Sequence, residues 1–116
     1  MSSYNTDLDK NAANYVPLTP LTFIKRAKEI YPDYEALIYE DRKYSWAEVY
    51  KRTVKFASAL SKAGIRKGDT VSFLAFNTPE IFEGHYSVPM TGAVLNTINI
   101  RLDAKTIAYI LDHSEA

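Results

Sequence analysis

The chain has 116 residues, of which 47% are hydrophobic and 24% charged, and its 14 Lys and Arg are balanced by 14 Asp and Glu. This composition indicates a globular protein and argues against a dedicated nucleic-acid binder, which needs an excess of basic residues to neutralise phosphates. The absence of cysteine excludes disulfides and thiolate metal sites, and no apolar run approaches the roughly 20 residues that span a bilayer.

The first 17 residues are polar and aperiodic, and we expect a flexible arm there. They lack the apolar core of a signal peptide, so the expected compartment is the cytoplasm. A helix is predicted to begin at Thr19 and Pro20, which are favourable at a helix cap and in a first turn. Pro32 is expected to end it, because the residue before a proline avoids the helical conformation.

A β-hairpin and a capped helix are predicted next. Residues 35–39 read as an apolar strand, residues 40–42 as a turn, and residues 43–44 as the returning strand. Ser45 and Glu48 have the spacing of a capping box, in which each side chain binds the other residue's backbone N–H. The residues expected on the apolar face of this helix, which Gly64 is expected to end, are Val49, Thr53, Phe56 and Leu60.

A strand–helix–strand unit follows. Residues 71–76 and 93–98 are nearly continuous apolar runs, which is typical of parallel strands buried on both faces. The intervening helix is expected to be capped by Asn77, with Glu80 three residues later, and Asp103 is expected to cap a last helix. The residues expected on the apolar face of the intervening helix are Ile81, Phe82, Tyr86 and Val88.

These elements predict the α/β class. The order strand, helix, strand implies two parallel strands joined by a crossover. Two such strands and a hairpin do not complete a parallel sheet, which needs neighbouring strands and helices on both faces. We therefore expect an incomplete part of a doubly wound, mostly parallel sheet domain with a β-hairpin. The arm would occupy residues 1–17 and the partial α/β domain residues 18–116.

Basic residues gather between Arg42 and Lys67, where eight of them accompany a single acid, Glu48. A phosphate-binding or partner-binding surface is one interpretation of this stretch. We favour a solvated helix face, because exposed lysine is the usual state in globular proteins. The lysines expected on that face are Lys51, Lys55 and Lys62.

Few other residues suggest a site. His85 has no evident titratable partner, so we expect a packed or solvated histidine rather than an acid–base group. Tyr44 and Trp46 could stack on an adenine, but their place at the start of an amphipathic helix favours core packing. Asn96 and Asn99 end a predicted parallel strand, where open α/β sheets place their ligand crevices. These two asparagines are the preferred candidates for lining residues.

Several short segments carry a further signal, in order: LTPLTFIKRA, ALIY to YSWAE, AGIRKGD with VSFLAFN, NTPE, VPMTGA, VLNTIN with RL, and YILDHSEA. From Leu18 to Ala116 they resemble the amino-terminal segment of AMP-forming acyl-CoA synthetases, which belong to the adenylate-forming ligases. The resemblance is nearest to the fatty-acyl branch, including medium-chain and methylthio-alkanoate CoA ligases.

The resemblance implies an ATP-dependent carboxylate–CoA ligase that uses ATP, coenzyme A and Mg²⁺ and acts on a small carboxylic acid. The family binds phosphates with a Ser/Thr/Gly-rich loop that ends in lysine, and it uses a carboxy-terminal lysine. Neither is present here, so we assign no catalytic, cofactor-binding or metal residue and expect the chain alone to be inactive.

The expected partners are therefore small molecules, with no nucleic acid and no membrane span. Because unpaired strand edges recruit other strands, we also expect a homo-oligomer. The alternative function is a stand-alone, non-catalytic α/β binding or interaction module.

Overall fold

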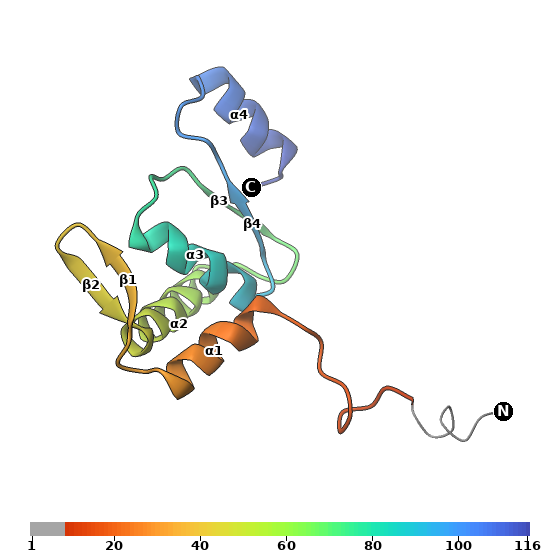
Figure 1. Ribbon diagram of the computed structural model, residues 1–116. Coiled ribbons are helices and arrows are strands. Elements are labelled where there is room, and N and C mark those ends of the chain that lie inside the picture. Colours follow the sequence, from red (N-terminus) through yellow and green to blue (C-terminus); the bar gives the residue numbers. More distant parts are fainter. Residues whose placement is uncertain (1–8) are drawn as a thin grey trace, which may run out of the picture.

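A computed structural model describes residues 9–116 (Figure 1). Its elements are, in order, α1 (Pro20–Ile30), β1 (Glu35–Tyr39), β2 (Arg42–Ser45), α2 (Trp46–Lys62), β3 (Thr70–Phe73), α3 (Pro79–Met90), β4 (Val94–Thr97) and α4 (Ala104–His113). No helix in this described part is long and apolar enough to cross a membrane.

The predicted arm at residues 1–17 lies partly outside the described residues. Residues 9–17 are exposed and contain no helix or strand, and Figure 1 shows them running away from the rest of the molecule. The boundary of the arm at residue 17 stays a prediction, and α1 begins three residues later.

The helix ends follow local hydrogen bonds that the sequence predicts. At the start of α1, the Leu21 N–H donates to Thr19 Oγ1 at 3.3 Å. At the start of α2, the Ser45 N–H donates to Glu48 Oε2 at 2.8 Å, and the Glu48 N–H donates to Ser45 Oγ at 3.3 Å. These bonds confirm the capping box. Gly64, just beyond α2, has a φ of +101°, a conformation that glycine adopts without steric cost.

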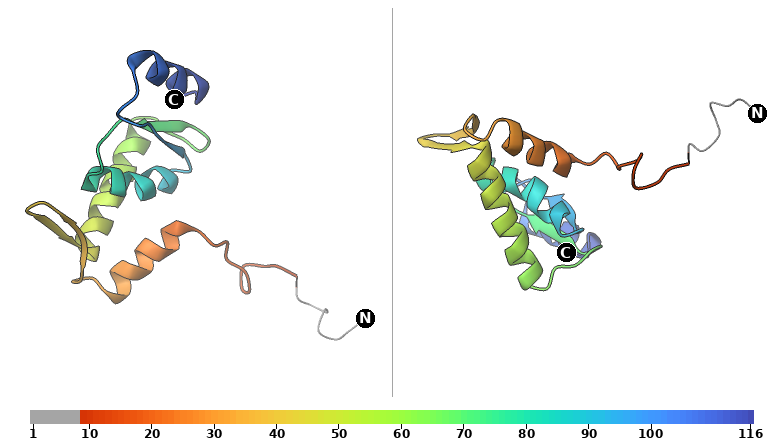
Figure 2. Two further views of the ribbon diagram at one scale, coloured as in Figure 1. Left: turned by 45° about the horizontal axis from the view of Figure 1, so that its top comes forward. Right: turned by 90° about the horizontal axis from the view of Figure 1, so that it is seen from below.

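Helices α1, α2 and α3 pack against one another and form the core, as Figures 1 and 2 show. The hairpin β1–β2 packs on α2, and β4 packs on α3. Val49 and Thr53 of the predicted α2 stripe are fully buried, whereas Phe56 is half-buried. The Phe56 ring meets the Phe73 ring edge to face, with 5.9 Å between centroids, and so connects α2 to β3. The other apolar core residues are Ile24, Ala57, Val88, Ala93 and Ile98.

The strands form two separate pairs. β1 and β2 are antiparallel, and β3 and β4 are parallel with Thr70 opposite Val94 and Phe73 opposite Thr97. The α/β class, the hairpin and the parallel strand–helix–strand unit are therefore confirmed. Within residues 9–116 the parallel sheet contains only two strands, so the doubly wound domain is incomplete, as predicted.

The predicted burial of the parallel strands on both faces is wrong for the described residues. β3 ends at Phe73 instead of residue 76, and Leu74 and Phe76 beyond it are 55% and 70% exposed. Val94 at the start of β4 is 56% exposed. A pair of strands has no third strand to extend the ladder, and helices cover only part of its surface, which explains both the short strands and the exposed side chains.

The predicted cap and apolar face of α3 also need correction. The N-cap is Thr78 rather than Asn77, and the Thr78 side chain makes no capping hydrogen bond. The buried residues of α3 are Pro79, Glu83, Gly84, Ser87 and Val88, so only Val88 of the predicted apolar face is buried. Small residues let the Phe73 ring approach: a Cβ added to Gly84 would lie 2.8 Å from it. Close packing and a charge pair, rather than the largest side chains, determine which side of α3 faces the core.

Candidate functional site

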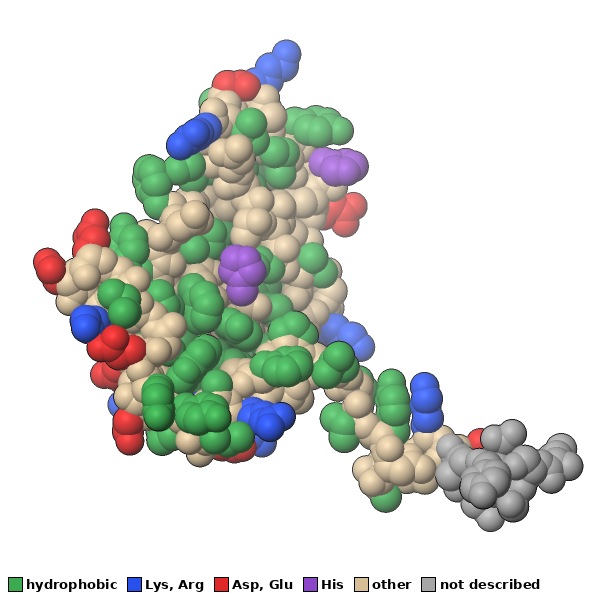
Figure 3. Space-filling view, viewed as in Figure 1, with side chains coloured by type: hydrophobic (Ala, Val, Ile, Leu, Met, Phe, Trp, Pro, Cys, Tyr) green, Lys and Arg blue, Asp and Glu red, His purple; other side chains and the backbone are tan. Residues whose placement is uncertain are grey.

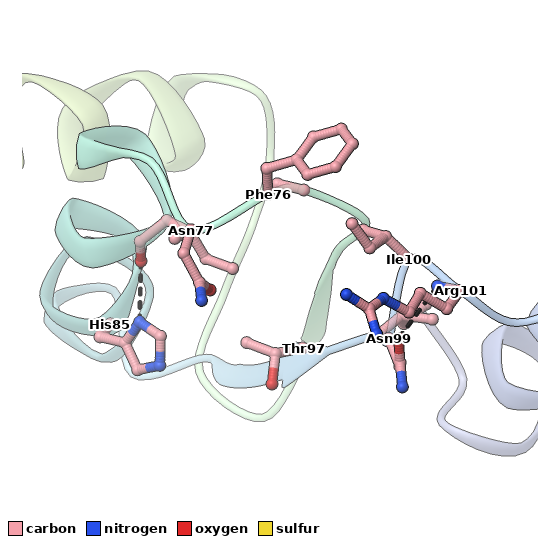
Figure 4. A pocket seen from close by; sticks show the side chains of 10 residues that line it. Phe76, Asn77, His85, Thr97, Asn99, Ile100 and Arg101 are labelled. Atoms are coloured by element: carbon pink, nitrogen blue, oxygen red, sulfur yellow. Dashed lines mark hydrogen bonds between the residues drawn. The ribbon is translucent and has the colours of Figure 1, made fainter. Parts of the chain in front are cut away.

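The carboxyl ends of β3 and β4 open into a cavity of about 480 Å³. Because the two strands are parallel, the loop from β3 to α3 and the loop from β4 to α4 leave the sheet at the same edge. The cavity lies between these loops and α3 (Figure 4), and its lining residues are Ala75, Phe76, Asn77, Ile81, His85, Thr97, Ile98, Asn99, Ile100 and Arg101. Open α/β sheets bind ligands at this position.

One wall of the cavity carries a histidine with a defined hydrogen bond. His85 Nδ1 lies 2.7 Å from the carbonyl oxygen of Ile81, one turn earlier on α3. A carbonyl oxygen can only accept, so Nδ1 carries the proton in this contact and Nε2 is left to interact with a ligand. The lining contains no Asp or Glu that could pair with the imidazole. The interpretation of His85 as a packed or solvated histidine, rather than an acid–base group, stays a prediction.

The opposite wall carries a positive charge. Figure 4 shows Arg101 beside Asn99, across the cavity from His85. The backbone N–H of Arg101 donates to Asn99 Oδ1 at 2.9 Å, which fixes the backbone of this loop and leaves the guanidinium out of this bond. Among the described residues Arg101 forms no salt bridge, so its guanidinium is available to a carboxylate or phosphate group.

The remaining lining is largely apolar, with Phe76, Ile81, Ile98 and Ile100. An apolar wall with one guanidinium suits an anionic ligand that also carries an apolar part. The lining offers no nucleophile–base pair and no paired carboxylates. The cavity can therefore bind and orient a ligand, but it lacks a set of groups for bond making or breaking.

The structure separates the two predicted lining asparagines. Asn99 lines the cavity, but Asn96 does not. The Asn96 amide donates instead to Ser72 Oγ at 2.8 Å and to Ser114 Oγ at 3.1 Å, and so ties β4 to β3 and to the end of α4. Arg101 was not predicted as a lining residue. Its position two residues after Asn99, in the same loop, was the only signal in the sequence.

The other predicted candidates lie outside this cavity. Tyr44 and Trp46 are half-buried, and the Arg52 guanidinium lies 4.8 Å from the centre of the Tyr44 ring. This contact accounts for Tyr44 as a packing residue. Lys51, Lys55 and Lys62 are all exposed, as expected of a solvated face.

A charge network that the sequence did not indicate positions α3. Glu83, whose side chain is only 5% exposed, binds Arg52 of α2 through two hydrogen bonds, one of them from Nη2 at 3.2 Å. Glu80, one turn earlier on α3, lies 2.9 Å from Arg42 of β2 and 3.8 Å from Arg52. The network joins the hairpin, α2 and α3, and therefore holds the helix that carries His85.

The pKa of Glu80 reflects this environment. A hydrogen bond with the Thr78 side chain, then its own backbone N–H, and then Arg42 lower the pKa of Glu80 from 4.5 to about 2. Each of these contacts favours the charged carboxylate. The Glu80 carboxylate therefore stays ionised throughout the physiological pH range.

Comparisons with known proteins agree on one family. Residues 24–116 match the model of the AMP-binding enzyme family. The chain is 50% identical over 110 residues to an acetate–CoA ligase of Humulus lupulus, which covers 95% of this chain and 19% of that protein. It is 53% identical over 110 residues to a peroxisomal trans-cinnamate:CoA ligase of Petunia hybrida, and this match covers 95% of this chain and 19% of that protein.

A solved structure shares the fold. The amino-terminal subdomain of NpsA from Klebsiella oxytoca, in complex with anthranilyl-AMSN, superposes with a TM-score of 0.79 and 24% identity. The match covers 84% of this chain and 25% of that one. The chain thus spans about one fifth of the length of the curated relatives and about one quarter of the solved subdomain.

Proposed function

This chain belongs to the AMP-binding enzyme family, and on that basis we propose that it is the amino-terminal part of an ATP-dependent carboxylate–CoA ligase. The observation that carries the proposal is the identity of about half of the residues to CoA ligases along 95% of the chain. In the proposed reaction a carboxylate attacks the α-phosphate of ATP, which releases pyrophosphate and forms an acyl-adenylate. The thiolate of coenzyme A then displaces AMP and forms the thioester.

The described residues do not themselves fit magnesium-bound ATP. The sequence contains no G-x-x-x-x-G-K segment to surround phosphates with backbone N–H groups and a lysine. Within residues 9–116, no group of three or more His, Asp or Glu side chains is placed to hold a metal ion. We therefore assign phosphate and metal binding to the rest of a longer ligase, and expect no acyl-adenylate from the 116-residue chain alone.

The contribution of this chain would be binding and orientation. Arg101 can donate two parallel hydrogen bonds to an anionic group, and Phe76 and Ile100 can contact an adjoining apolar part. A residue that binds the substrate and the transition state equally changes KM and leaves kcat unaltered. In a complete ligase, Arg101→Met should therefore raise KM for one anionic substrate. An unchanged KM for the carboxylate, ATP and coenzyme A would remove Arg101 from the site.

Similarity over this segment does not indicate which acyl group the full-length protein would activate. An acetate ligase and a trans-cinnamate ligase are 50% and 53% identical to it, although one acts on a two-carbon acid and the other on an aryl acid. We propose a small carboxylic acid as the substrate class, with medium-chain and methylthio-alkanoates as the branch to test first. Assays with a panel of acetate, butyrate, hexanoate, methylthiopropionate, benzoate and cinnamate would rank these classes.

Compartment and assembly are separate proposals. We propose that the protein is cytoplasmic. We also propose that it forms a homo-oligomer, and the unpaired edges of the β3–β4 pair support this second proposal. The Petunia relative is peroxisomal, so the peroxisome is the competing compartment. Fluorescence microscopy of the tagged full-length protein would decide the compartment, and sedimentation would decide the assembly.

A chimera tests the proposed function. In it, this chain replaces the matching 110 residues of the Humulus acetate–CoA ligase. We expect the chimera to form acetyl-CoA from acetate, ATP and coenzyme A, and the isolated chain to form none. Turnover by the isolated chain would contradict our assignment of the chemistry to the rest of the protein. A folded but inactive chimera would instead favour a stand-alone binding module.

A further inference from the structure

The loop after β4 and helix α4 are hydrogen-bonded to the rest of the molecule at two points. At the start of this segment, the Ile98 N–H donates to the carbonyl oxygen of Phe73 at 2.8 Å, just beyond the β3–β4 pair. At its end, the Asn96 amide donates to Oγ of Ser114, the residue that caps α4, at 3.1 Å. In the part of the chain that the structure describes, every other hydrogen bond of residues 99–116 stays within that segment.

Packing adds little to this attachment. No residue of α4 is buried, and Tyr109 on it is 65% exposed. Figure 1 shows α4 beyond the strands and away from α1 and α2, with the chain end turned back towards β3 and β4. In the same view, Figure 3 shows α4 as the upper end of the molecule. A helix that buries so little surface opens locally with ease and depends on its few polar contacts.

The Asn96 amide joins three elements at once. An asparagine amide has two N–H donors, and those of Asn96 reach Ser72 Oγ on β3 at 2.8 Å and Ser114 Oγ at the end of α4. The Ser114 hydroxyl donates its own hydrogen to the carbonyl oxygen of Leu111 at 3.2 Å, so its oxygen is left to accept from Asn96. The bond between Asn96 and Ser114 therefore closes a span of 18 residues.

Arg101 lies inside this span, in the loop that lines the cavity. We propose that Asn96 is a positioning residue: it holds the end of α4 against the sheet, keeps the loop of residues 99–103 in place, and so directs the Arg101 guanidinium into the cavity. The proposal rests on the proposed function and adds the residue that orients its anion-binding arginine. A group that is already held in place loses less conformational freedom on binding, so loss of this hold weakens binding.

Two hydroxyl deletions separate this role from general support of the strands. Ser114→Ala removes the bond that holds α4, whereas the matched control Ser72→Ala removes only the bond to β3, which still pairs with β4 along its ladder. Asn96→Ala removes both bonds. Neither serine is fully buried, so we expect both serine variants to fold. Each variant is made in the chimera with the Humulus ligase, and circular dichroism checks the fold.

The kinetic test compares KM with kcat. Ser114→Ala and Asn96→Ala should raise KM by about three- to tenfold, the effect of one lost hydrogen bond, for the substrate whose KM rises in Arg101→Met. They should leave kcat unaltered. Ser72→Ala should leave the KM values of the carboxylate, ATP and coenzyme A unchanged. Because Ser114 acts through Arg101, the double variant Ser114→Ala/Arg101→Met should have the same KM as Arg101→Met alone.

Hydrogen exchange gives a readout that does not depend on catalysis. In the isolated chain and in the chimera, the amides of residues 104–113 should exchange about three- to tenfold faster in Ser114→Ala than in Ser72→Ala, because α4 opens more readily without its bond to Asn96. The amides of α2 should exchange at equal rates in both variants. Mass spectrometry of peptides from the two helices measures these rates.

An unchanged KM in Ser114→Ala, or an equal rise in Ser72→Ala, would overturn the positioning role and leave the proposed function of the active chimera intact. Additive effects in the double variant would also overturn it, because Ser114 and Arg101 would then act separately. Loss of folding in Asn96→Ala leaves Ser114→Ala to report. An inactive parent chimera would instead contradict the proposed function. In that case, equal exchange of α4 in the two serine variants of the isolated chain would still overturn the hold on α4.

Discussion

Replacement of Arg52 by methionine should destabilise the chain strongly, although Arg52 lies on a helix surface. The Arg52 side chain is 38% exposed, but its partner Glu83 is only 5% exposed. Arg52 supplies both of the hydrogen bonds from an arginine to the Glu83 carboxylate. Arg52→Met therefore leaves a buried carboxylate without its counter-charge, while the methionine keeps much of the apolar stem.

The size of the effect follows from this geometry. Removal of one partner from a buried ion pair costs about 3–5 kcal/mol. Because Arg52 is partly exposed, water can enter beside the carboxylate, and the loss should lie at or just below the lower limit of this range, at about 2–3 kcal/mol. Loss of the guanidinium over the Tyr44 ring adds about 0.5–1 kcal/mol. A total of about 3 kcal/mol is a large part of the roughly 5–15 kcal/mol typical of small domains.

Thermal and urea unfolding, followed by circular dichroism, measure this loss. At about 4 °C per kcal/mol for a chain of 116 residues, the midpoint should fall by about 12 °C. The matched control is Lys55→Met, which removes an exposed charge from the same helix and should change the stability by less than about 0.5 kcal/mol.

The double variant Arg52→Met/Glu83→Leu separates the two contributions. Removal of both charges leaves no unpaired carboxylate, so most of the lost stability should return. If Arg52→Met unfolds at the wild-type midpoint, the buried Glu83 carboxylate does not need Arg52 as its counter-charge. If the double variant is as unstable as the single one, the loss comes from packing and not from an unpaired charge.

Three further substitutions test separate parts of the fold. Gly84→Ala should cost up to about 2 kcal/mol, since an added Cβ would lie 2.8 Å from the Phe73 ring and overpacking offsets the roughly 1 kcal/mol gain in helix propensity; stabilisation would show that the ring moves freely. Phe56→Asp should lower the stability by several kcal/mol, because it places an unpaired carboxylate against Phe73; a wild-type melting curve would contradict the assigned helix face. Thr78→Val should raise the pKa of Glu80 above its value of about 2, as measured by NMR titration of the carboxyl.

The Thr78 variant also has a consequence for acid stability. A carboxyl whose pKa is lowered on folding contributes stability above its unfolded pKa of about 4.5, and this contribution is lost as the pH falls towards 2. Thr78→Val should therefore reduce the stability at pH 7 and flatten its dependence between pH 4.5 and 2. Parallel stability curves for the variant and the wild type would show that the Thr78 hydroxyl does not control Glu80.

The parts of the fold that the sequence predicts are those whose hydrogen-bond partners lie close together in the chain. Ser45 and Glu48 satisfy one another within a single turn, and Asp103 accepts from the Thr106 N–H at 3.1 Å. Thr19 does the same for Leu21 at the start of α1. Such contacts can be read from spacing alone, which explains why the helix starts at these positions were predicted correctly.

The face of α3 could not be predicted in this way, because distant residues decide it. Glu83 binds Arg52, which lies 31 residues earlier in the chain, and Gly84 contacts the Phe73 ring. An acid and a glycine would ordinarily be assigned to the outside of an amphipathic helix. The apolar residues that were assigned to the inside, such as Phe82, instead line a cavity between β1 and α3.

The candidate cavity was predicted in part for a similar reason. The strand order predicted that ligand-lining residues follow β4, and Asn99 does line the cavity. Asn96 lies within β4 and contacts Ser72 on β3 instead. Whether a side chain at the end of a strand faces the crevice or the neighbouring strand depends on where the strand stops. Apolar composition alone does not fix that residue.

Carboxylate-dependent exchange of pyrophosphate into ATP tests the central claim most directly, because it reports adenylation without the thioester step. The measurement compares the isolated chain, the chimera with the Humulus ligase and the parent ligase, each with ATP, Mg²⁺ and acetate. We predict exchange by the chimera and the parent, and none by the isolated chain. Exchange by the isolated chain, or a folded chimera without exchange, would contradict the claim that this chain is the amino-terminal part of a CoA ligase.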